Sequence, residues 1–458
     1  MSPGPEARRR TRRALACAAG FVPAAALWWM GCSPGASPSG AGGAAPDGVA
    51  ARPAALRSGA NLVFLNDANQ AGTVLVEQVL AAWQQAQPGV AVEWVRPEGT
   101  VSLTAMVAAG TPPDVFAADP NAFAGLAAGG ETLALDGYAK RDRVDLADFF
   151  PAALELGKWQ GKQHGLPRAF NAGVLYTNLS MFDQAGVPRP PEQWGGPRWT
   201  WNEFLDAAQR LSVRAEDPKQ ARFGADLLGG NGFFWSFVFA NGGQMFDAEM
   251  TATRLHEPPA VAALQLLADL IHRQNANPTP DVKRALGDRN IFNNGQAAMQ
   301  LIGASNVNLY QAIEQFPWDW RPLPAGRAGP KGWAVGFDWA VSSRSRLREE
   351  AWAFLQHLVS AASQATLAGN YFPARRTAVQ RFLDDEAKAG RAPGGPPANR
   401  QVVLDAMQQA VVRANHARFA DVQRVLDEEL SPLWAQGGSA QAVAEAIKRR
   451  ADPILQGT

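Results

Sequence analysis

Residues 61–95, NLVFLNDANQAGTVLVEQVLAAWQQAQPGVAVEWV, decide the fold. The apolar runs 62–65 and 90–95 are typical of buried strands. Between them we expect a helix, because apolar residues recur there at intervals of three and four: Val76, Val79, Leu80 and Trp83. Pro88 and Gly89 end that helix. A strand, a helix and a strand within about 35 residues form the unit from which parallel sheets are built, so the sequence predicts an α/β fold.

Further elements of the same kind follow along the chain. We expect a short helix at 102–109 and a third strand at 114–117. Thr200 and Glu203 have the spacing of a capping box, which predicts the start of another helix. Later helices are expected at 261–272, 349–359, 402–413 and 440–449.

The composition is that of a folded chain without a surplus of positive charge. Of 458 residues, 47% are hydrophobic and 19% are charged, which excludes global disorder. The formal net charge is +1, and the five arginines and one glutamate of residues 1–31 leave the rest of the chain slightly acidic. Nucleic acid is therefore not an expected partner.

Motifs for covalent or metal chemistry are absent from the sequence. Cys17 and Cys32 are the two cysteines, so the body of the chain has neither a disulfide scaffold nor a cysteine-based metal site. The body of the chain, residues 58–458, contains no G-x-S-x-G elbow, no S-x-x-K and no P-loop. We expect no catalytic residue, cofactor or metal. Glycoside hydrolysis needs only two well-placed carboxyl groups, so the sequence leaves it open.

The N-terminus has the pattern of an export signal. A basic segment, 8–13, precedes the uncharged apolar run 14–30, which predicts a cleaved signal rather than a spanning helix. The arginine pairs leave the twin-arginine and the general secretion routes open. Gly31 and Cys32 end the run, and a segment rich in Ser, Pro, Gly and Ala follows at 33–55. This pattern resembles a lipoprotein signal with a lipidated Cys32 and a flexible tether.

Tryptophan is abundant: the chain has 15, and 13 of them lie beyond the signal. Indole offers a flat apolar face and one N–H donor, which suits stacking on the C–H face of a sugar ring. Four tryptophans lie on periodic faces and are predicted to be core: Trp83, Trp94, Trp352 and Trp434. Three lie beside glycine or small residues, in segments that we expect to be loops, and are candidates for ligand contact: Trp235, Trp333 and Trp339.

Several motifs, taken in order, resemble those of one known family. They include LAAWQQAQPGVAVEW (80–94), MVAAGTPPDVFAAD (106–119), HGLPRAFNAGVLYTNLSMFDQAGVPRPPEQW (164–194) and GWAVGFDWAVSS (332–343). Their order and spacing over roughly residues 60–380 resemble the bacterial extracellular solute-binding proteins of the maltose-binding type. No single motif is diagnostic, but the ordered set is.

The resemblance implies a two-lobed periplasmic-binding-protein fold with a ligand cleft between the lobes. It places a signal peptide at 1–31 and the tether at 32–57. The N-lobe would comprise 58–167 and 331–367, and the C-lobe 171–320 and 371–450. The segments 321–330 and 368–370 would act as hinges beside the crossing at 166–171. Ligands of open parallel sheets bind beyond the carboxyl ends of the strands, and closure about the hinges is the expected motion.

The resemblance also implies candidate ligand-binding residues, which are polar or aromatic and lie near strand ends or crossings: Asn66, Asp67, Asn69, Asp119, Arg168, Phe170, Asn171, Trp235, Ser305, Asn306, Trp333, Asp338, Trp339, Tyr371 and Arg375. Asn69 and Asp119 are also suited to capping turns or helices, and Arg375 to pinning a hinge. Trp235 follows two phenylalanines, and three neighbouring aromatic residues cannot share one face, so at least one is expected to be directed elsewhere. Many relatives have a tryptophan where this chain has Ala304, Ser305 and Asn306, a departure that argues against a maltose-like oligosaccharide.

The function implied is capture of a carbohydrate and its delivery to the transmembrane subunits of an ABC importer. The chain would be a monomer tied to the outer face of the cytoplasmic membrane, or in the periplasm, by its lipid anchor. Two alternatives stay open: an extracellular lipoprotein glycoside hydrolase, and a binding protein for a non-sugar such as a polyamine or a phosphodiester.

Overall fold

The computed structural model describes residues 56–97, 102–195, 199–228, 232–287, 290–310, 312–388 and 397–457. By its internal contacts the chain divides into two units, Met1–Ala50 and Ala51–Thr458, and all described residues belong to the second. The predicted signal, Cys32 and most of the tether lie outside the described residues. Within the described part, no helix is long and apolar enough to cross a membrane.

A mixed sheet runs through the described unit. Eight of its strands are connected in the order β2-β1-β3-β9-β6-β7, with β8 also paired to β6 and β10 to β9. These strands are β1 (Ala60–Leu65), β2 (Val90–Val95), β3 (Val115–Ala118), β6 (Gly165–Asn178), β7 (Met299–Gly303), β8 (Trp318–Arg321), β9 (Gly332–Val341) and β10 (Ala410–Val411). A separate hairpin consists of β4 (Lys158–Trp159) and β5 (Lys162–Gln163).

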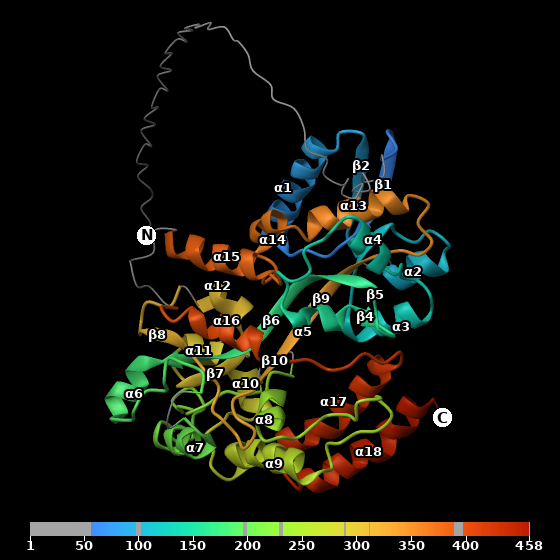
Figure 1. Cartoon of the computed structure of the whole chain (residues 1–458). Helices are drawn as coiled ribbons and strands as arrows, with labels where there is room; N and C mark the ends of the chain where they lie inside the picture. The colour runs from blue at the N-terminus through green and yellow to red at the C-terminus, as the bar shows by residue number, and fades with distance from the viewer. Residues whose placement is uncertain are drawn as a thin grey trace, which may run out of the picture. The chain divides into compact units, whose positions relative to one another are not determined.

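Helices surround the sheet on both faces (Figure 1). In chain order they are α1 (Gln70–Ala86), α2 (Leu103–Ala108), α3 (Pro120–Ala128), α4 (Asp136–Arg141), α5 (Pro151–Leu156), α6 (Leu179–Ala185), α7 (Trp201–Arg210), α8 (Trp235–Ala240), α9 (Pro258–His272), α10 (Pro280–Leu286), α11 (Asn290–Asn293), α12 (Val307–Tyr310), α13 (Arg348–Leu358), α14 (Ala361–Leu367), α15 (Arg376–Lys388), α16 (Gln401–Gln408), α17 (Phe419–Gln436) and α18 (Ala440–Gln456). A short 3₁₀ turn, Ala304–Asn306, precedes α12.

The predicted strand, helix and strand at residues 61–95 are confirmed. β1 and β2 are parallel, with Ala60 opposite Val90 and Leu65 opposite Val95. The expected apolar face of α1 packs into the core, and the indole N–H of Trp83 donates to the carbonyl of Val90 at 3.0 Å. The sequence pattern therefore predicted this unit correctly.

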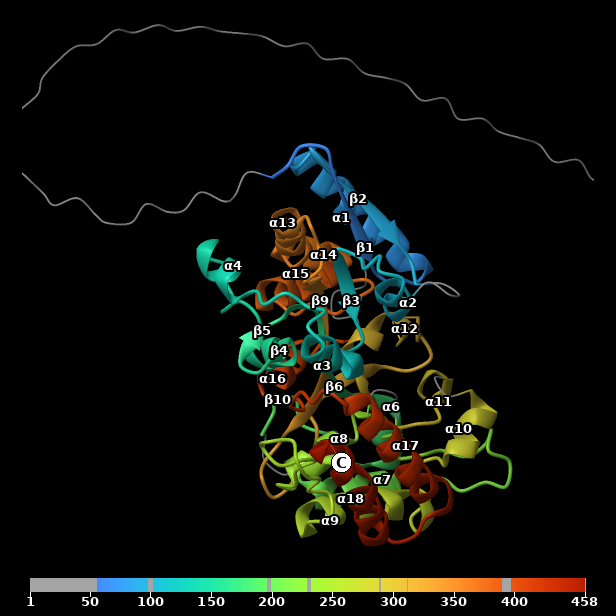
Figure 2. The same ribbon diagram turned by 90° about the vertical axis from the view of Figure 1, so that its right-hand side faces the viewer.

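Two lobes lie on either side of the long strands β6 and β9 (Figures 1 and 2). The first lobe contains β1–β3, α1–α5, α13 and α14, and the second contains α6–α9, α17 and α18. Phe64 and Phe354 are buried in the first lobe, and Phe204 and Leu426 in the second. All 14 residues of β6 are buried, because the strand pairs with β9, β7 and β8 in turn. β6 therefore connects the two lobes within one sheet.

Two expectations about local structure were wrong or incomplete. The helix expected at 402–413 ends at Gln408, because Ala410 and Val411 pair with the first residues of β9. Trp333 and Trp339 lie in β9 and Trp235 opens α8, so none of the three is in a loop. Helical periodicity cannot reveal a strand partner that is distant in sequence. The capping box of Thr200 and Glu203 is present.

Candidate functional site

Asn66, directly after β1, is the centre of a buried polar cluster. Its side-chain oxygen accepts from Trp339 Nε1 at 2.9 Å and from Arg168 Nη1 at 3.1 Å. Its amide nitrogen donates to the Tyr371 hydroxyl at 3.0 Å and to the Asp67 carbonyl at 2.8 Å. These bonds use the full capacity of the Asn66 amide, which fixes its orientation. We call Asn66, Asp67, Arg168, Trp339 and Tyr371 the arginine cluster.

Arg168 brings the only positive charge of the arginine cluster to the crossing strand β6. Its Nη1 lies 2.5 Å from the Asp67 carboxylate, which is 61% exposed, and its guanidinium lies 4.3 Å from the ring centre of Tyr371. The Arg168 Nε is buried and has no hydrogen-bond partner among the described residues. Burial raises the pKa of Tyr371, an effect that the charge of Arg168 opposes. The hydroxyl of Tyr371 therefore stays protonated and donates to the Asp67 carbonyl.

Asp338 lies behind this cluster on β9, opposite Pro167 of β6 and Ala118 of β3. The side chain is buried, and its Oδ1 has no hydrogen-bond partner among the described residues. Burial raises the pKa of Asp338 to about 8, although the charge of Arg168 acts in the opposite direction. The carboxyl group is therefore mostly neutral at pH 7.

A second polar contact joins β6 to the turn that follows β7. Asn171 Nδ2 donates to Ser305 Oγ at 2.8 Å, and the Ser305 N–H donates back to Asn171 Oδ1 at 3.1 Å. Asn306 donates to the carbonyl of Gly303 at 3.1 Å. A Cβ at Gly303 would lie 2.1 Å from Asn171 Nδ2, so a larger residue there would displace the Asn171 amide. Three candidates, Asn171, Ser305 and Asn306, therefore meet at one place.

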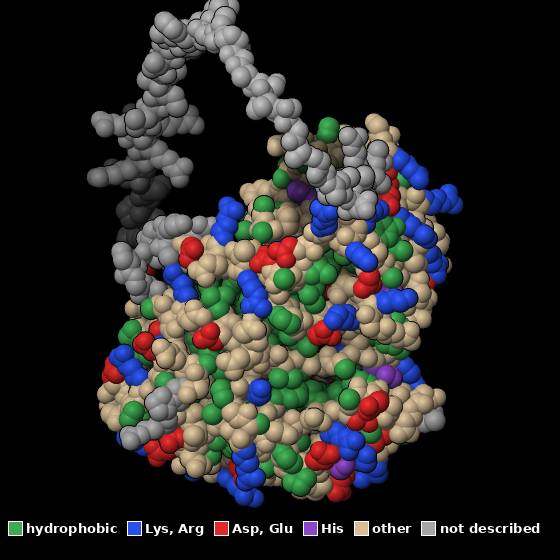
Figure 3. Space-filling model, in the orientation of Figure 1, with side chains coloured by type: hydrophobic (Ala, Val, Ile, Leu, Met, Phe, Trp, Pro, Cys, Tyr) green, Lys and Arg blue, Asp and Glu red, His purple; other side chains and the backbone are tan. Residues whose placement is uncertain are grey.

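Trp235 and Trp333 line one cavity of about 360 Å³, which we call the tryptophan cavity. Asn121, Leu156 and Phe337 contribute to its wall from the first lobe and from β9, and α17 contributes from the second lobe. Figure 3 shows apolar side chains in the hollow between the lobes. The charged and polar side chains at this wall are Asn121, Arg413, Gln423 and Asp427.

Trp235 and the two phenylalanines before it are buried or half-buried, and none of the three side chains is exposed to solvent. Phe233 is fully buried, Trp235 is 4% exposed and Phe234 is half-buried. Phe234 and Trp235 both line the cavity, and their ring centres are 4.7 Å apart. Trp333 stacks on Phe239 with 5.7 Å between ring centres. Trp235 and Trp333 are thus part of the second lobe's core and of the cavity wall at once.

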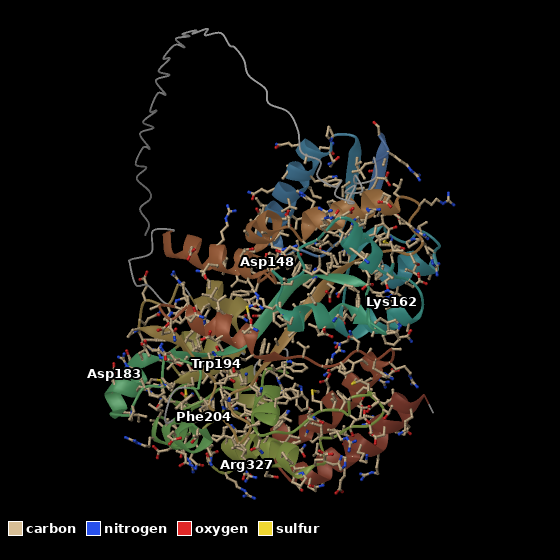
Figure 4. All side chains as sticks on the ribbon, viewed as in Figure 1. Asp148, Lys162, Asp183, Trp194, Phe204 and Arg327 are labelled. Atoms are coloured by element: carbon tan, nitrogen blue, oxygen red, sulfur yellow. The ribbon has the colours of Figure 1, made fainter. Side chains whose placement is uncertain are left out.

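Phe170 and Arg375 contact other residues of the first lobe, and neither lines the tryptophan cavity. Phe170 is 0% exposed and stacks on Phe150, so its side chain is inaccessible in the described conformation, and its contact with a ligand stays a prediction. Arg375 donates to the carbonyls of Val359 at 2.5 Å and Asp145 at 3.0 Å. It also pairs with Asp148, which is labelled in Figure 4, at 3.3 Å. Arg375 therefore pins the segment after Tyr371 to the first lobe.

Asn69 and Asp119 cap helices, as the alternative interpretation predicted. Asn69 Oδ1 accepts from the Gly72 N–H at 2.7 Å at the start of α1, and Asp119 Oδ1 accepts from the Asn121 N–H at 2.8 Å at the start of α3. Both side chains are exposed, so capping does not prevent a ligand contact.

Arg413, Gln423 and Asp427 were not predicted from the sequence. They lie in a helix and in the segment before it, and no motif distinguishes them from solvated surface residues. Arg413 is almost fully buried, lies 3.6 Å from the ring centre of Phe419, and has its pKa lowered to about 10 by burial. Among the described residues, no group of three or more His, Cys, Asp or Glu side chains is arranged to hold a metal ion.

Comparison with known proteins identifies the family. The family model described as bacterial extracellular solute-binding protein matches residues 67–365. A putative binding protein of Brucella abortus is 25% identical over 293 residues, which are 62% of this chain and 67% of the relative.

Solved structures share the two-lobed fold. An ABC substrate-binding protein of Listeria monocytogenes in complex with cycloalternan has a TM-score of 0.72 and 20% identity, and the match covers 86% of this chain and 98% of that one. UgpB of Mycobacterium tuberculosis in complex with glycerophosphocholine has a TM-score of 0.70 and 21% identity, with coverage of 87% and 98%.

Proposed function

Because this chain belongs to the family of bacterial extracellular solute-binding proteins, we propose that it captures a carbohydrate outside the cytoplasm and delivers it to an ABC importer. The observation that carries the proposal is that Trp235 and Trp333 line one cavity together with polar side chains. Binding and release are sufficient for this role, so no bond of the solute is broken.

The wall of the tryptophan cavity suits a sugar ring. Trp235, Trp333 and Phe337 supply apolar aromatic surface for the C–H face of a ring. Asn121 and Gln423 supply amide donors and acceptors for hydroxyl groups. A mostly apolar cavity with a few polar groups that fix orientation is the usual form of a small-molecule site.

The charges at the cavity wall favour a sugar over a polyamine. A polyamine needs several carboxylates, and Asp427 is the one carboxylate at the described wall of the cavity. A phosphodiester is the second candidate, because the Arg413 guanidinium is at the wall and donates to the neutral groups of Pro120 and Asn121. The Mycobacterium tuberculosis relative in complex with glycerophosphocholine is consistent with this second candidate.

Capture proceeds by closure of the lobes about the crossings at 166–171, 321–330 and 368–370. A solute that contacts both lobes at once stabilises the closed form by its differential affinity. The first lobe, with β1–β3, α1 and α13, then moves relative to the second lobe, with α8, α9, α17 and α18. The importer's transmembrane subunits recognise the closed form of the monomer.

Export and anchoring are part of the same proposal. The basic and apolar pattern of residues 1–31 directs the chain across the cytoplasmic membrane. Cys32 then carries the lipid, and the tether at 32–57 leaves the lobes free to reach the importer.

A thermal-shift screen tests the proposed function. The panel contains mono- and oligosaccharides, a polyamine and glycerophosphocholine, because a solute that binds only the folded chain raises its melting temperature. We expect a sugar to give the largest shift and to be recovered chemically unchanged after incubation. Steady hydrolysis of the sugar would establish the hydrolase instead, and a shift with glycerophosphocholine alone would establish the second candidate.

A further inference from the structure

Residues 412–418 form a strap between β10 and α17 that runs along the boundary between the two lobes (Figure 1). The strap is not one of the three crossings at which the lobes are expected to hinge. Backbone pairing and the chain's continuation into α17 join the strap to the second lobe, whereas the Asn415 side chain joins it to the end of α5 in the first lobe.

The second lobe holds the strap at both ends. Before the strap, Ala410 and Val411 pair with Gly332 and Trp333 of β9. Near its end, the ring of His416 is hydrogen-bonded to the carbonyl of Leu455 in α18 at 3.2 Å. The strap continues directly into α17, whose apolar face is buried in the second lobe. The strap therefore moves with the second lobe.

A single side chain connects the strap to the end of α5 in the first lobe. Asn415 Nδ2 donates to the carbonyls of Lys158 at 2.7 Å and Leu156 at 2.8 Å, with Glu155 at 3.3 Å. Glu155 and Leu156 lie in the last turn of α5 and Lys158 follows it, and the final carbonyls of a helix lack the regular amide partner one turn further on. The amide of Asn415 is thus aimed at a set of acceptors that only the first lobe presents.

A close backbone approach accompanies this contact. A Cβ at Gly125 of α3 would lie 2.9 Å from the carbonyl oxygen of Ala417, so the strap touches α3 where the helix has no side chain. Arg413 Nη2 donates to the Pro120 carbonyl at 2.6 Å in the same region. Asn415 and Gly125 are absent from the wall of the tryptophan cavity, whereas Arg413 is part of it.

We propose that Asn415 is a latch of the closed form, which slows release of the solute without touching it. The latch rests on the proposed function, because its bonds to the α5 carbonyls form when the lobes close and break when they open. Asn415 is a positioning residue: it holds the lobes in the arrangement in which the cavity walls meet the solute. Gly125 permits that arrangement by leaving room for the strap.

Two variants and two matched controls test the latch, with binding followed by stopped-flow tryptophan fluorescence on the best sugar of the panel. Asn415→Ala removes the donor, and Gly125→Ala blocks the close approach. Asn399→Ala is the control for the first, because Asn399 Nδ2 also donates to two carbonyls, those of Glu192 and Trp320, away from the strap. Gly137→Ala is the control for the second, because a Cβ there meets nothing within 4 Å.

We expect Asn415→Ala to speed release about five- to tenfold, the equivalent of one or two hydrogen bonds, with little change in the association rate. The ratio of affinities for two different sugars stays the same, because the cavity wall is intact. The melting temperature of the unliganded chain stays within the range of the Asn399→Ala control. Gly125→Ala speeds release too, yet raises the unliganded melting temperature, because alanine is the better helix former.

Other outcomes overturn the latch or the function separately. If Asn415→Ala lowers the melting temperature of the unliganded chain and leaves the release rate unchanged, the bonds of Asn415 are present with and without solute, and the latch is overturned. A changed ratio of sugar affinities means that Asn415 contacts the solute and overturns it too. A wild-type chain that binds no sugar of the panel overturns the proposed function, and the inference with it.

Discussion

The side-chain oxygen of Asn66 accepts the indole N–H of Trp339 at 2.9 Å, although 273 positions separate the two residues in the chain. Arg168 donates to the same oxygen, so the loop after β1 and the strands β6 and β9 are joined at one atom. The first crossing between the lobes, at Arg168, is therefore tied to the end of β1 in the first lobe.

Arg168→Met tests how much the contacts of Arg168 with Asn66 and Asp67 contribute to the free energy of unfolding. The substitution keeps much of the buried volume but removes the donor to Asn66 and the partner of Asp67. We expect the free energy of unfolding to fall by about 1–3 kcal/mol, because polar groups of the cluster lose a partner. Urea unfolding measures this change. Asp67→Asn, at an exposed carboxylate, is the control and is expected to cost less than about 1 kcal/mol.

Trp235→Phe tests the tryptophan cavity. Phenylalanine keeps an aromatic face but loses the N–H group and part of the apolar area. We expect solute binding to weaken by about 1–2 kcal/mol, or roughly five- to thirtyfold, as calorimetry would measure. Trp194→Phe is the matched control, because Trp194 donates to the Val402 carbonyl outside the cavity (Figure 4). If Trp235→Phe and Trp194→Phe bind the solute with equal affinity, Trp235 does not contact the solute.

Asp338→Asn tests the buried carboxyl group through the pH dependence of stability. The pKa of Asp338 is raised to about 8 in the folded chain, so the folded state holds a proton that the unfolded state releases near pH 4. Wild-type stability therefore falls as pH rises from about 4 to 8 and levels off above 8, with a slope of at most about 1.4 kcal/mol per pH unit from this group. We expect Asp338→Asn to remove that slope.

Denaturant unfolding at intervals between pH 5 and 9 measures this dependence. Asp183→Asn is the control, because Arg189 holds the pKa of Asp183 below its ordinary value and the carboxylate stays ionised throughout this range (Figure 4). A parallel pH profile for wild type and Asp338→Asn would show that Asp338 is already ionised at neutral pH.

Cys32→Ala tests the anchor. A lipid-modified cysteine with two or three acyl chains holds a protein firmly to a membrane, and its loss removes that attachment. We expect the variant to appear in the soluble fraction or to keep its signal uncleaved, as cell fractionation and mass spectrometry would reveal. Normal processing together with unchanged membrane retention would contradict the prediction.

Local pattern was sufficient for single elements in both lobes. The spacing of Val76, Val79 and Trp83 predicted the buried face of α1, and Thr200 with Glu203 predicted the start of α7. These features depend on neighbours within a few residues, so they can be read from the chain directly.

The candidate site was predicted in part. The arginine cluster joins five of the predicted residues, and Asn171 with Ser305 joins two more. The burial of Phe170 was not predicted, because along a strand buried on both faces the alternation of polar and apolar residues that marks an exposed side disappears. Arg413 and Asn415 were missed, because their partners are carbonyl groups more than 250 positions away.

The sequence by itself determined the α/β class, the order of the elements of the first lobe and the resemblance to a binding-protein family, because periodicity and motif order are local properties of the chain. Only the tertiary structure decided which side chains meet: that Trp339 bonds to Asn66, that Trp235 and Trp333 share one cavity, and that Asn415 joins the strap to α5. These contacts depend on how β6 and β9 pair and how the lobes pack across them. Pairing between strands so distant in sequence is set by the packing of the whole chain and leaves no local signal.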